Sequence, residues 1–355
     1  MFLNGIGTAT PPGRYTKAEC WSALRASEWF GRLDRRSHAI AEAVLLRDNG
    51  ISARRLALDS LADVFAIDPD TLHRRFLKHA PALAIAAAAK AAHDANIDPQ
   101  DIDAVVISTC TGYLCPGLTS YVAESLGLRA DVQAFDLVGQ GCGAALPNWG
   151  LAAALIRGGT AQHVLSICSE VSSAAMYLDN DPGVLISACL FGDGAGAAVL
   201  SARPAEHKRR IEWRGMESVL EPGQRNALRF EQRGGMLRNI LTRPVPALAA
   251  EHAQAVLATV LRCEELDVSD IAAWILHAGG RDVLQALSQR IGLTEGELRY
   301  SAAMLAEYGN MSSAFVYFVL EAALEDQAPG GWWWMSAFGA GFTCHGALLA
   351  VETRK

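Results

Sequence analysis

Charged side chains are scarce in this chain. Asp, Glu, Lys and Arg make up 19% of its 355 residues, and the net charge at neutral pH is −7. An acidic balance gives no support to nucleic-acid binding, which relies on basic surfaces. The eight cysteines show no Cys-x-x-Cys or Cys/His spacing, which argues against a zinc site and against a disulfide framework. The composition is typical of a protein with reduced thiols in the cytosol.

Signals for export or membrane insertion are also missing. The first residues, Met-Phe-Leu-Asn-Gly, contain no basic segment followed by a long apolar stretch, so we expect no secretory signal. The alanine-rich run at 80–92 is interrupted by Lys90 and is too short to span a bilayer. We therefore expect a cytoplasmic protein without stable membrane insertion. Its 51% hydrophobic content allows a large core, and its length predicts two domains or one duplicated unit.

The second half of the chain repeats the first. At an offset of 169 residues, the segment 97–107 falls on 266–276, 151–155 falls on 320–324, and Cys142 falls on Met311. At a different offset, Phe-Gly-Asp-Gly at 191–194 returns as Phe-Gly-Ala-Gly at 338–341. Matches in chain order predict a duplicated supersecondary unit. We expect an N-terminal half at 1–205 with a nucleophilic cysteine and a C-terminal half at 206–355, with the seam in the stretch 201–233.

Short apolar runs alternate with Ala- and Leu-rich helical runs in both halves. The runs that predict strands are 105–108, 132–137, 164–168 and 196–200, then 272–276, 332–337 and 347–352. The clearest predicted helices are 80–95, 148–157 and 312–323. Strands that are apolar on both faces belong to sheets covered by helices. The pattern therefore predicts an α/β fold with a layered architecture.

Cys142 stands in Val-Gly-Gln-Gly-Cys-Gly-Ala-Ala, between a strand-like run and a helix-like run. Unpaired backbone N–H groups and the positive end of the dipole at a helix N-terminus stabilise a thiolate. The flanking glycines allow a substrate to approach the sulfur closely. These features indicate an activated nucleophile. The alternative at this point is a buried structural cysteine, since free cysteine is among the most buried residue types.

Two further residues complete a candidate catalytic set. His277 ends an expected strand and is followed by Ala-Gly-Gly, and Asn310 lies in the second half at the junction that Cys142 occupies in the first. Strand ends followed by glycine turns are where α/β folds carry reacting groups. His277 can pair with Cys142 as imidazolium and thiolate, so that the sulfur takes up an acyl group from a thioester. The imidazole and the Asn310 amide can both donate hydrogen bonds to a developing oxyanion.

Four motifs together carry a family resemblance. They are Gly-Gln-Gly-Cys142-Gly, Trp-Ile-Leu-His277-Ala-Gly-Gly, Tyr-Gly-Asn310-Met-Ser-Ser and Leu-Phe191-Gly-Asp-Gly-Ala. From Gly5 to Glu352 the chain resembles type III polyketide synthases, the chalcone synthase-like branch of the thiolase superfamily. The resemblance implies a thiolase fold with a duplicated αβαβα architecture, and a homodimer. It also implies an acyltransferase without a cofactor, which uses acyl-CoA and malonyl-CoA as substrates and needs no carrier protein.

The resemblance also implies a reaction. Such an enzyme loads a starter acyl-CoA on its cysteine, extends it with malonyl-CoA by decarboxylative Claisen condensation, and cyclises the product. By motif, Cys142 is the expected nucleophile, and His277 and Asn310 are expected to stabilise the thioester oxyanion and the enolate. Phe191 resembles the aromatic gatekeeper between the coenzyme A tunnel and the pocket. Without the resemblance, Phe191 is more simply a core phenylalanine before a turn.

Further positions resemble the pocket of the family. The pocket-wall residues implied by the resemblance are Cys110, Thr111, Ala175, Leu190 and Ser312. Cys115, just before Pro116, resembles the residue that reaches into the cavity of the other subunit. Paired arginines can hold phosphates, and among these pairs we expect Arg54 and Arg55 to bind coenzyme A.

Several positions differ from the plant-type members of this family, and these differences predict which starter acyl group fits. The segment 235–242 lacks the second gatekeeper phenylalanine, and 337–341 reads Ala-Phe-Gly-Ala-Gly in place of Gly-Phe-Gly-Pro-Gly. Cys110 and Ala175 have small side chains, which predicts room for a medium or long aliphatic starter. The sequence Gly-Cys-Gly-Ala-Ala-Leu-Pro-Asn resembles bacterial alkylresorcinol and alkylpyrone synthases, which implies a resorcinol or pyrone product.

Other functions stay open at the level of sequence. A β-ketoacyl-ACP synthase III carries the same Cys/His/Asn set but performs one condensation with an acyl carrier protein. A type III synthase can also start from an aromatic acyl group or from malonyl. A thiolase-fold subunit that only binds or scaffolds is a further alternative, against which the intact set of Cys142, His277 and Asn310 argues.

Overall fold

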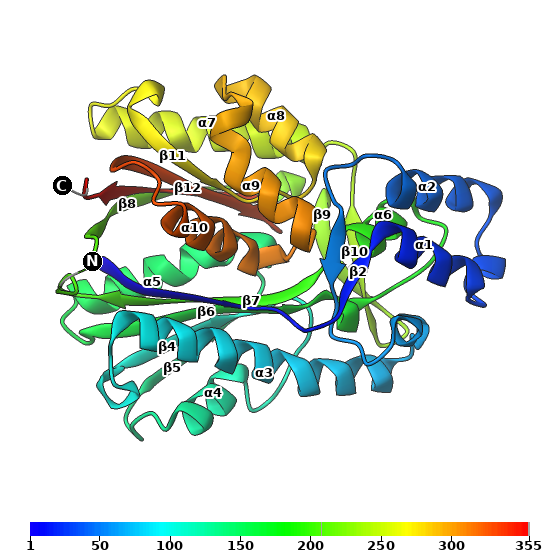
Figure 1. Cartoon of the computed structure of the whole chain (residues 1–355), viewed down its shortest axis with the longest axis horizontal. Coiled ribbons are helices and arrows are strands. Elements are labelled where there is room, and N and C mark those ends of the chain that lie inside the picture. Colours follow the sequence, from blue (N-terminus) through cyan, green and yellow to red (C-terminus); the bar gives the residue numbers. More distant parts are fainter. Residues whose placement is uncertain (207, 354–355) are drawn as a thin grey trace.

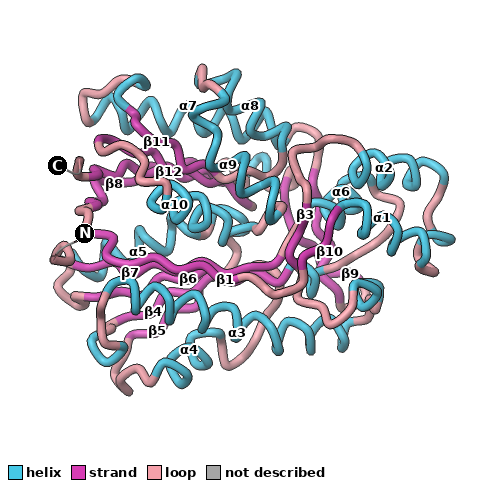
Figure 2. Tube along the Cα trace, viewed as in Figure 1, coloured by secondary structure: helices cyan, strands magenta, loops and turns pink. Residues whose placement is uncertain are grey.

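The structure is a computed structural model that describes residues 1–206 and 208–353. Its centre is a mixed sheet of nine strands (Figure 1, Figure 2). From one edge to the other, the strands are β11 (Ile271–Leu276), β12 (Gly331–Gly339), β13 (Thr343–Val351), β8 (Ile211–Leu220), β1 (Phe2–Ala9), β7 (Asp193–Ser201), β6 (His163–Val171), β4 (Ala104–Ser108) and β5 (Gln133–Leu137).

The sheet consists of two halves with the same strand pattern. In the first half β4 runs parallel to β6, and β6, β7 and β1 then follow antiparallel. In the second half β11 runs parallel to β12, and β12, β13 and β8 follow antiparallel. The halves meet where β1 and β8 pair at Phe2 and Glu212. In the sequence repeat, β4 corresponds to β11. The duplicated α/β fold is therefore confirmed, whereas the boundary between residues 205 and 206 stays a prediction.

Helices separate and cover the two halves of the sheet (Figure 1). The outer face of the first half carries α3 (Pro69–Ala95) and α4 (Leu118–Leu126). Between the halves lie α5 (Ala145–Arg157) and α10 (Phe315–Glu325), each in contact with strands of both. The outer face of the second half carries α7 (Val245–Cys263), against which α8 (Arg281–Ile291) packs, while α9 (Glu295–Tyr308) packs on β11 and α10. The result is the layered αβαβα arrangement.

Smaller elements form a cap at one end of these layers, at the right of Figure 1. They are the helices α1 (Lys17–Ala26), α2 (Arg35–Leu46) and α6 (Pro182–Leu190), the strand pair β2 (Arg14–Thr16) and β3 (Ala53–Arg55), and the hairpin of β9 (Leu228–Arg233) and β10 (Met236–Leu241). Contacts of α6 with α2 and with β10 hold the cap together. The cap faces the ends of β5, β11 and α9, where the candidate catalytic residues lie.

Single 3-10 turns join many of these elements. Their bounds are η1 (Phe30–Arg32), η2 (Leu61–Phe65), η3 (Pro99–Asp101), η4 (Gly141–Gly143), η5 (Ser172–Ala175), η6 (Pro222–Gln224), η7 (Val268–Asp270) and η8 (Ser312–Ala314). Two of them, η4 and η8, stand directly before the central helices α5 and α10. They are equivalent points of the two halves, and both lie at the candidate site.

The helix expected at 80–95 is the C-terminal part of a longer helix. α3 begins at Pro69, because the Asp68 side chain accepts a hydrogen bond from the Thr71 N–H, and proline fits the first helical position. It continues through Pro81 and ends at Asn96, which adopts the left-handed conformation. Sequence patterns did not indicate the N-terminal strand β1. The expected seam at 201–233 contains β8, an interior strand of the sheet.

Large aromatic side chains fill the layer between the two halves of the sheet. Trp149 on α5 donates a hydrogen bond from Nε1 to the Tyr317 hydroxyl on α10, at 3.1 Å. Tyr317 also bonds the Ser166 hydroxyl of β6, so the polar atoms of this core are paired. Within the residues that the structure describes, no helix combines the length and apolar character needed to cross a bilayer.

Candidate active site

Cys142 lies in η4, between the end of β5 and the start of α5, as the sequence predicted. Its side chain is buried, with 7% exposure. The loop that follows β12 packs directly on this turn. A Cβ atom added to Gly339 would lie 2.3 Å from the Gln140 carbonyl oxygen and 2.7 Å from the Gly143 nitrogen. Glycine at 339 therefore allows the second half of the chain to enclose the thiol.

The surroundings of the Cys142 thiol keep it protonated at neutral pH. Burial raises the pKa of Cys142 to about 12, although the Ser312 hydroxyl, which donates a hydrogen bond to Sγ at 3.2 Å, acts in the opposite direction. A buried thiolate loses its hydration, and this cost exceeds what one hydroxyl donor restores. The unliganded site therefore holds a thiol that becomes a nucleophile only when its proton is accepted elsewhere.

His277 follows β11 and faces the same cavity as Cys142. Its ring packs edge-on against Phe315 and Phe338, with centroid separations of 5.5 and 5.0 Å. Burial lowers the pKa of His277 to about 3, so the imidazole is neutral at physiological pH. Among the described residues, neither ring nitrogen has a hydrogen-bond partner.

The structure therefore differs from the expected imidazolium–thiolate pair. The sulfur of Cys142 accepts its hydrogen bond from Ser312, and both members of the expected pair are neutral. The physical reason is desolvation, which penalises each charged form in a dry cavity. A neutral imidazole can instead both donate a hydrogen bond and accept a proton, because one ring nitrogen carries N–H and the other has a free lone pair. Its unpartnered nitrogens are available to a substrate.

Asn310 follows Gly309, where the chain leaves α9 with a φ of 70°. Its side chain is held on both sides: Oδ1 accepts from the Ser312 N–H at 2.8 Å, and Nδ2 donates to the Gly279 carbonyl at 3.2 Å. The Ser312 bond fixes which way the amide points, because only the oxygen can accept. One N–H of Nδ2 is left for a ligand in the cavity that Asn310 lines.

Cys142, His277 and Asn310 line one cavity of about 600 Å³. Its walls come from the cap and from the second half of the chain, with Leu190 of α6 among them. Exposed arginines from three separate segments also line it: Arg36, Arg243 and Arg281. The cavity thus combines apolar walls with three exposed arginines, one of which, Arg281, pairs with Asp48 at 3.2 Å. Such a lining suits an apolar group joined to a phosphorylated carrier.

Phe191 lies between this cavity and a smaller one. It is buried at the end of α6 and lines both. The smaller cavity has a volume of about 20 Å³, and Thr111 and Ala175 belong to its wall, as expected. Phe230 and Tyr177 also line it, so aromatic side chains occupy the space that Ala175 and the aromatic-free segment 235–242 leave. The cavity that these residues line is thus much smaller than the pocket expected beyond Phe191.

A buried carboxylate that the sequence analysis missed lies behind the nucleophile. Glu170 on β6 has no exposed surface. Its oxygens accept hydrogen bonds from the Thr111 hydroxyl at 2.9 Å, the Ser313 hydroxyl and the Cys110 backbone N–H at 3.1 Å. The Ser312 hydroxyl lies 3.2 Å from a Glu170 oxygen and 3.2 Å from Cys142 Sγ, so its single proton is donated to one of these two atoms at a time. Cys110 thus faces Glu170 and Ser312 and is absent from the wall of the smaller cavity. The feature of the sequence that could have indicated this carboxylate is a glutamate, Glu170, two residues after the apolar run at 164–168.

The two arginines expected to bind coenzyme A do not face the cavity. Arg54 is buried and donates to the Ala188 and Phe191 carbonyls. Arg55 pairs with Glu307 at 3.0 Å. Cys115 is exposed, in the turn between β4 and α4. Neither arginine is among the residues that line the cavity of Cys142, so the geometry does not favour the expected coenzyme A contact of Arg54 and Arg55.

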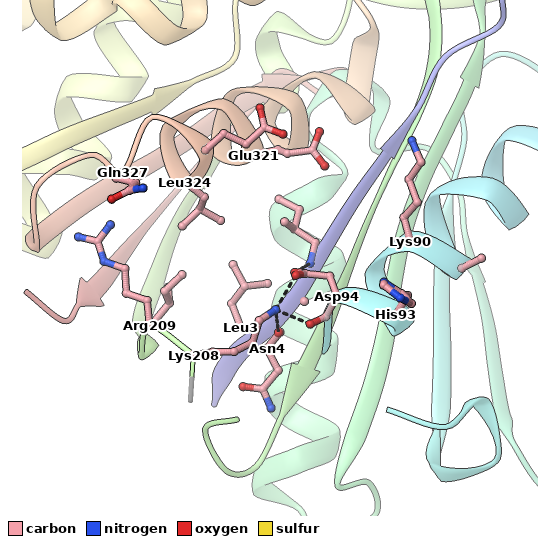
Figure 3. A pocket seen from close by; sticks show the side chains of 15 residues that line it. Leu3, Asn4, Lys90, His93, Asp94, Lys208, Arg209, Glu321, Leu324 and Gln327 are labelled. Carbon is pink, nitrogen blue, oxygen red and sulfur yellow. Dashed lines mark hydrogen bonds and ion pairs between the residues drawn. The ribbon is translucent and has the colours of Figure 1, made fainter. Parts of the chain in front are cut away.

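A further cavity of about 690 Å³ opens far from this site, beside the start of β1 and the ends of α3 and α10 (Figure 3). Lys208 bonds Asp94 there, and Lys90 bonds the Thr8 carbonyl. Cys142, His277 and Asn310 are not among the residues that line it. The three candidate catalytic residues line the 600 Å³ cavity instead.

Two family models match the chain. One, described as FAE1/type III polyketide synthase-like protein, matches residues 15–219. The other, the C-terminal domain of chalcone and stilbene synthases, matches residues 218–352. The two matches meet inside β8 and together cover nearly the whole chain.

Individual relatives agree with these models. A 3,5-dihydroxyphenylacetyl-CoA synthase of Streptomyces toyocaensis is 28% identical over 97% of this chain and 88% of its own length. An alpha-pyrone synthesis polyketide synthase-like protein of Mycobacterium tuberculosis is 26% identical over 99% of this chain and 91% of its own length. The solved 1,3,6,8-tetrahydroxynaphthalene synthase of Streptomyces coelicolor A3(2) superposes with a TM-score of 0.88 at 23% identity, covering 100% of both chains. That structure confirms the fold.

The raised pKa of Cys142 predicts how its reactivity depends on pH. Below about pH 12 the thiolate fraction grows about tenfold per pH unit, so alkylation by iodoacetamide is expected to accelerate about tenfold per unit between about pH 7 and about pH 9. Mass spectrometry of the Cys142 peptide measures this rate separately from the exposed Cys115 and Cys263. Ser312→Ala is expected to slow labelling at every pH, because the donor to Sγ is lost. A rate independent of pH across this range would indicate an ion pair with His277 instead.

Proposed function

The chain belongs to the type III polyketide synthases, and we propose that Cys142 takes a starter acyl group from an acyl-CoA, which malonyl-CoA then extends by decarboxylative Claisen condensation. The chain is therefore an acyltransferase. The observation that carries the proposal is the common cavity, in which a buried thiol, an imidazole with two unpartnered nitrogens and a fixed amide face the same space.

Acyl loading needs a base for the Cys142 proton. The neutral His277 can accept it as the sulfur attacks the carbonyl carbon of the acyl-CoA. The carbonyl oxygen becomes an oxyanion, which accepts a hydrogen bond from the Asn310 amide. When the tetrahedral intermediate collapses, the C–S bond to coenzyme A breaks, and the proton on His277 passes to the departing sulfur. The acyl group is then a thioester of Cys142.

Chain extension needs donors but no base. When the malonyl thioester loses CO₂, the electron pair of the broken C–C bond forms an enolate whose negative oxygen requires stabilisation. The His277 N–H and the Asn310 amide can both donate to that oxygen. The enolate carbon then attacks the acyl carbon on Cys142 and expels the thiolate, which leaves the lengthened chain on coenzyme A. A neutral histidine and a neutral asparagine suit this step, because both can donate a hydrogen bond to the enolate oxygen and the step requires no base.

We assign the phosphates of coenzyme A to Arg36, Arg243 and Arg281, in place of Arg54 and Arg55. The first three are exposed side chains on the wall of the catalytic cavity. Guanidinium groups bind phosphate oxygens through paired N–H donors. They come from α2, from the connection to α7 and from the first residue of α8, so bound coenzyme A would bridge the cap and the second half of the chain.

The starter is proposed to be a short acyl group or malonyl itself. The cavity beyond Phe191 has a volume of about 20 Å³, little more than the about 10–15 Å³ that one water molecule needs. This observation favours the malonyl-starter alternative over the medium or long aliphatic chain that Cys110 and Ala175 predicted. The relatives named for dihydroxyphenylacetyl-CoA and for alpha-pyrone support ring closure of the product to a resorcinol-type or pyrone ring.

We also propose that the active enzyme is a homodimer joined along β5. This strand is at one edge of the sheet, and unpaired strand edges invite pairing with a second chain. Two apolar side chains nearby are strongly exposed: Val138 by 68% and Tyr113 by 72%. Cys115 lies two residues beyond Tyr113 and would face the same interface. Val138→Glu is expected to shift sedimentation toward the monomer, whereas Val268→Glu, at a remote exposed valine, is expected to leave the dimer intact.

The function is tested by incubating the purified protein with malonyl-CoA, with and without a panel of acyl-CoA starters. We expect polyketide products by mass spectrometry in the absence of any acyl carrier protein, and none with Cys142→Ala. His277→Ala and Asn310→Ala are each expected to lower turnover about 100- to 1,000-fold, the typical cost of an oxyanion donor. Product formation only with a carrier protein would support a β-ketoacyl-ACP synthase III instead. Activity retained by Cys142→Ala would remove this cysteine from the mechanism.

Phe230 is expected to limit the size of the starter. Phe230→Ala removes bulk from the smaller cavity and is expected to extend the accepted acyl chain, since each buried methylene gains about 0.8 kcal/mol. Ala175→Phe fills the same cavity and serves as the opposite variant. The measurement is relative kcat/KM across a series of acyl-CoAs of increasing length. A wild-type preference for long chains, unchanged in Phe230→Ala, would overturn the short-starter proposal.

A further inference from the structure

Arg54 is a buried cation whose hydrogen-bond partners are two backbone carbonyls and a cysteine sulfur. Only 5% of the residue is exposed. Its guanidinium donates to the Ala188 carbonyl at 2.8 Å, to the Phe191 carbonyl at 3.0 Å and to the Cys20 sulfur at 3.4 Å. Nε has no partner among the described residues. A buried guanidinium without a hydrogen-bonded carboxylate is costly, so its location calls for a physical reason.

The carbonyls that Arg54 binds explain why the charge is tolerated there. Ala188 is in the last turn of α6, and Phe191 is the residue that ends this helix. Carbonyls at a helix C-terminus lack intrahelical partners and carry the negative end of the dipole. Arg54 therefore supplies the donors and the positive charge for the end of α6. Two bonds from the same Nη1 atom also fix the backbone position of Phe191.

The same side chain lies against the segment that carries Asn310. Gly309 packs on the aliphatic stem of Arg54, since a Cβ added to Gly309 would lie 3.1 Å from Arg54 Cγ. The two segments are themselves joined, because the Asn310 N–H donates to the Leu190 carbonyl and the Gly192 N–H donates to the Asn310 carbonyl. Arg54 thus contacts both segments of the short parallel bridge that pairs Phe191 with Asn310.

We propose that Arg54 is a positioning residue that sets the Phe191 ring and the Asn310 amide relative to Cys142. The inference rests on the proposed function, because it assigns the two segments to the gate and to the oxyanion donor. Without Arg54 the end of α6 loses its donors and Gly309 loses its packing surface. Asn310 would then stabilise the enolate less well, and Phe191 would separate the two cavities less strictly.

Two variants separate charge from geometry. Arg54→Met keeps the length of the stem but removes the charge and the donors. It is expected to lower kcat for malonyl-CoA about 100-fold, which is the typical effect of misplacing a catalytic group by about 1 Å. KM is expected to stay nearly unchanged, because Arg36, Arg243 and Arg281 are intact. The distribution of product lengths is also expected to change. Arg54→Lys retains a cation at the end of α6 and is expected to recover part of the loss.

Arg75→Met is the matched control. Arg75 is also buried and donates to two backbone carbonyls, those of Ser173 and Asp63, and no hydrogen bond among the described residues joins it to Phe191 or Asn310. We expect both Met variants to lower Tm, and only Arg54→Met to change kcat and product lengths. Thermal unfolding, kcat, KM and mass spectrometry of products are measured for all three variants and the wild type.

The outcomes distinguish this inference from the proposed function. A wild type that forms no polyketide from malonyl-CoA or any tested starter overturns the proposed function. An active wild type matched by Arg54→Met in kcat and product lengths overturns the positioning role. The same holds if kcat falls equally in Arg54→Met and Arg75→Met at equal loss of Tm, because the effect is then one of stability. No recovery in Arg54→Lys, with Tm restored, also contradicts the role.

Discussion

Desolvation of the catalytic groups is the constraint on which the rest of this structure depends. The end of β12 at Gly339 packs on the turn of Cys142, and both the thiol and the imidazole of His277 are buried. This raises the pKa of the first to about 12 and lowers that of the second to about 3. The thiol of Cys142 and the imidazole of His277 are therefore both neutral at physiological pH. In the proposed mechanism charge develops on the oxygen of a bound thioester, and in a dry site each hydrogen bond to that oxygen is strong.

Such a site needs rigid support, and the duplicated fold supplies it from both halves. Cys142 and Asn310 lie near the starts of the two central helices, α5 and α10, which pack between the halves of the sheet. His277 comes from β11, an edge strand of the second half. Because the three groups stand on elements that share one core, their spacing does not depend on loops alone. The cap then determines what reaches them, through α6 and the hairpin of β9 and β10.

Polar groups behind the nucleophile are paired within the chain. Glu170 is buried, and its acceptors are occupied by hydroxyls and a backbone N–H, while Ser312 connects this network to the sulfur of Cys142. A fully satisfied buried network holds its members in one arrangement. On the other side, Arg54 satisfies the end of α6. Cys142 is thus connected through Ser312 to the buried Glu170, and the segments of Asn310 and Phe191 both contact the buried Arg54.

The sequence by itself determined the family, a candidate catalytic set and much of the strand and helix pattern of the layered core, but not the central strands β1 and β8. Apolar periodicity and the internal repeat report on which faces are buried, and Cys142, His277 and Asn310 stand in motifs whose local geometry is nearly complete in the sequence. Only the tertiary structure decided the ionisation of Cys142 and His277, the volume beyond Phe191 and the partners of Arg54. Small side chains at 110 and 175 predicted space, but Phe230, from another element, fills it. An arginine pair predicted phosphate binding, but Arg54 turns inward. These properties depend on neighbours that are distant in sequence, and burial by such neighbours is what sets both pKa and volume.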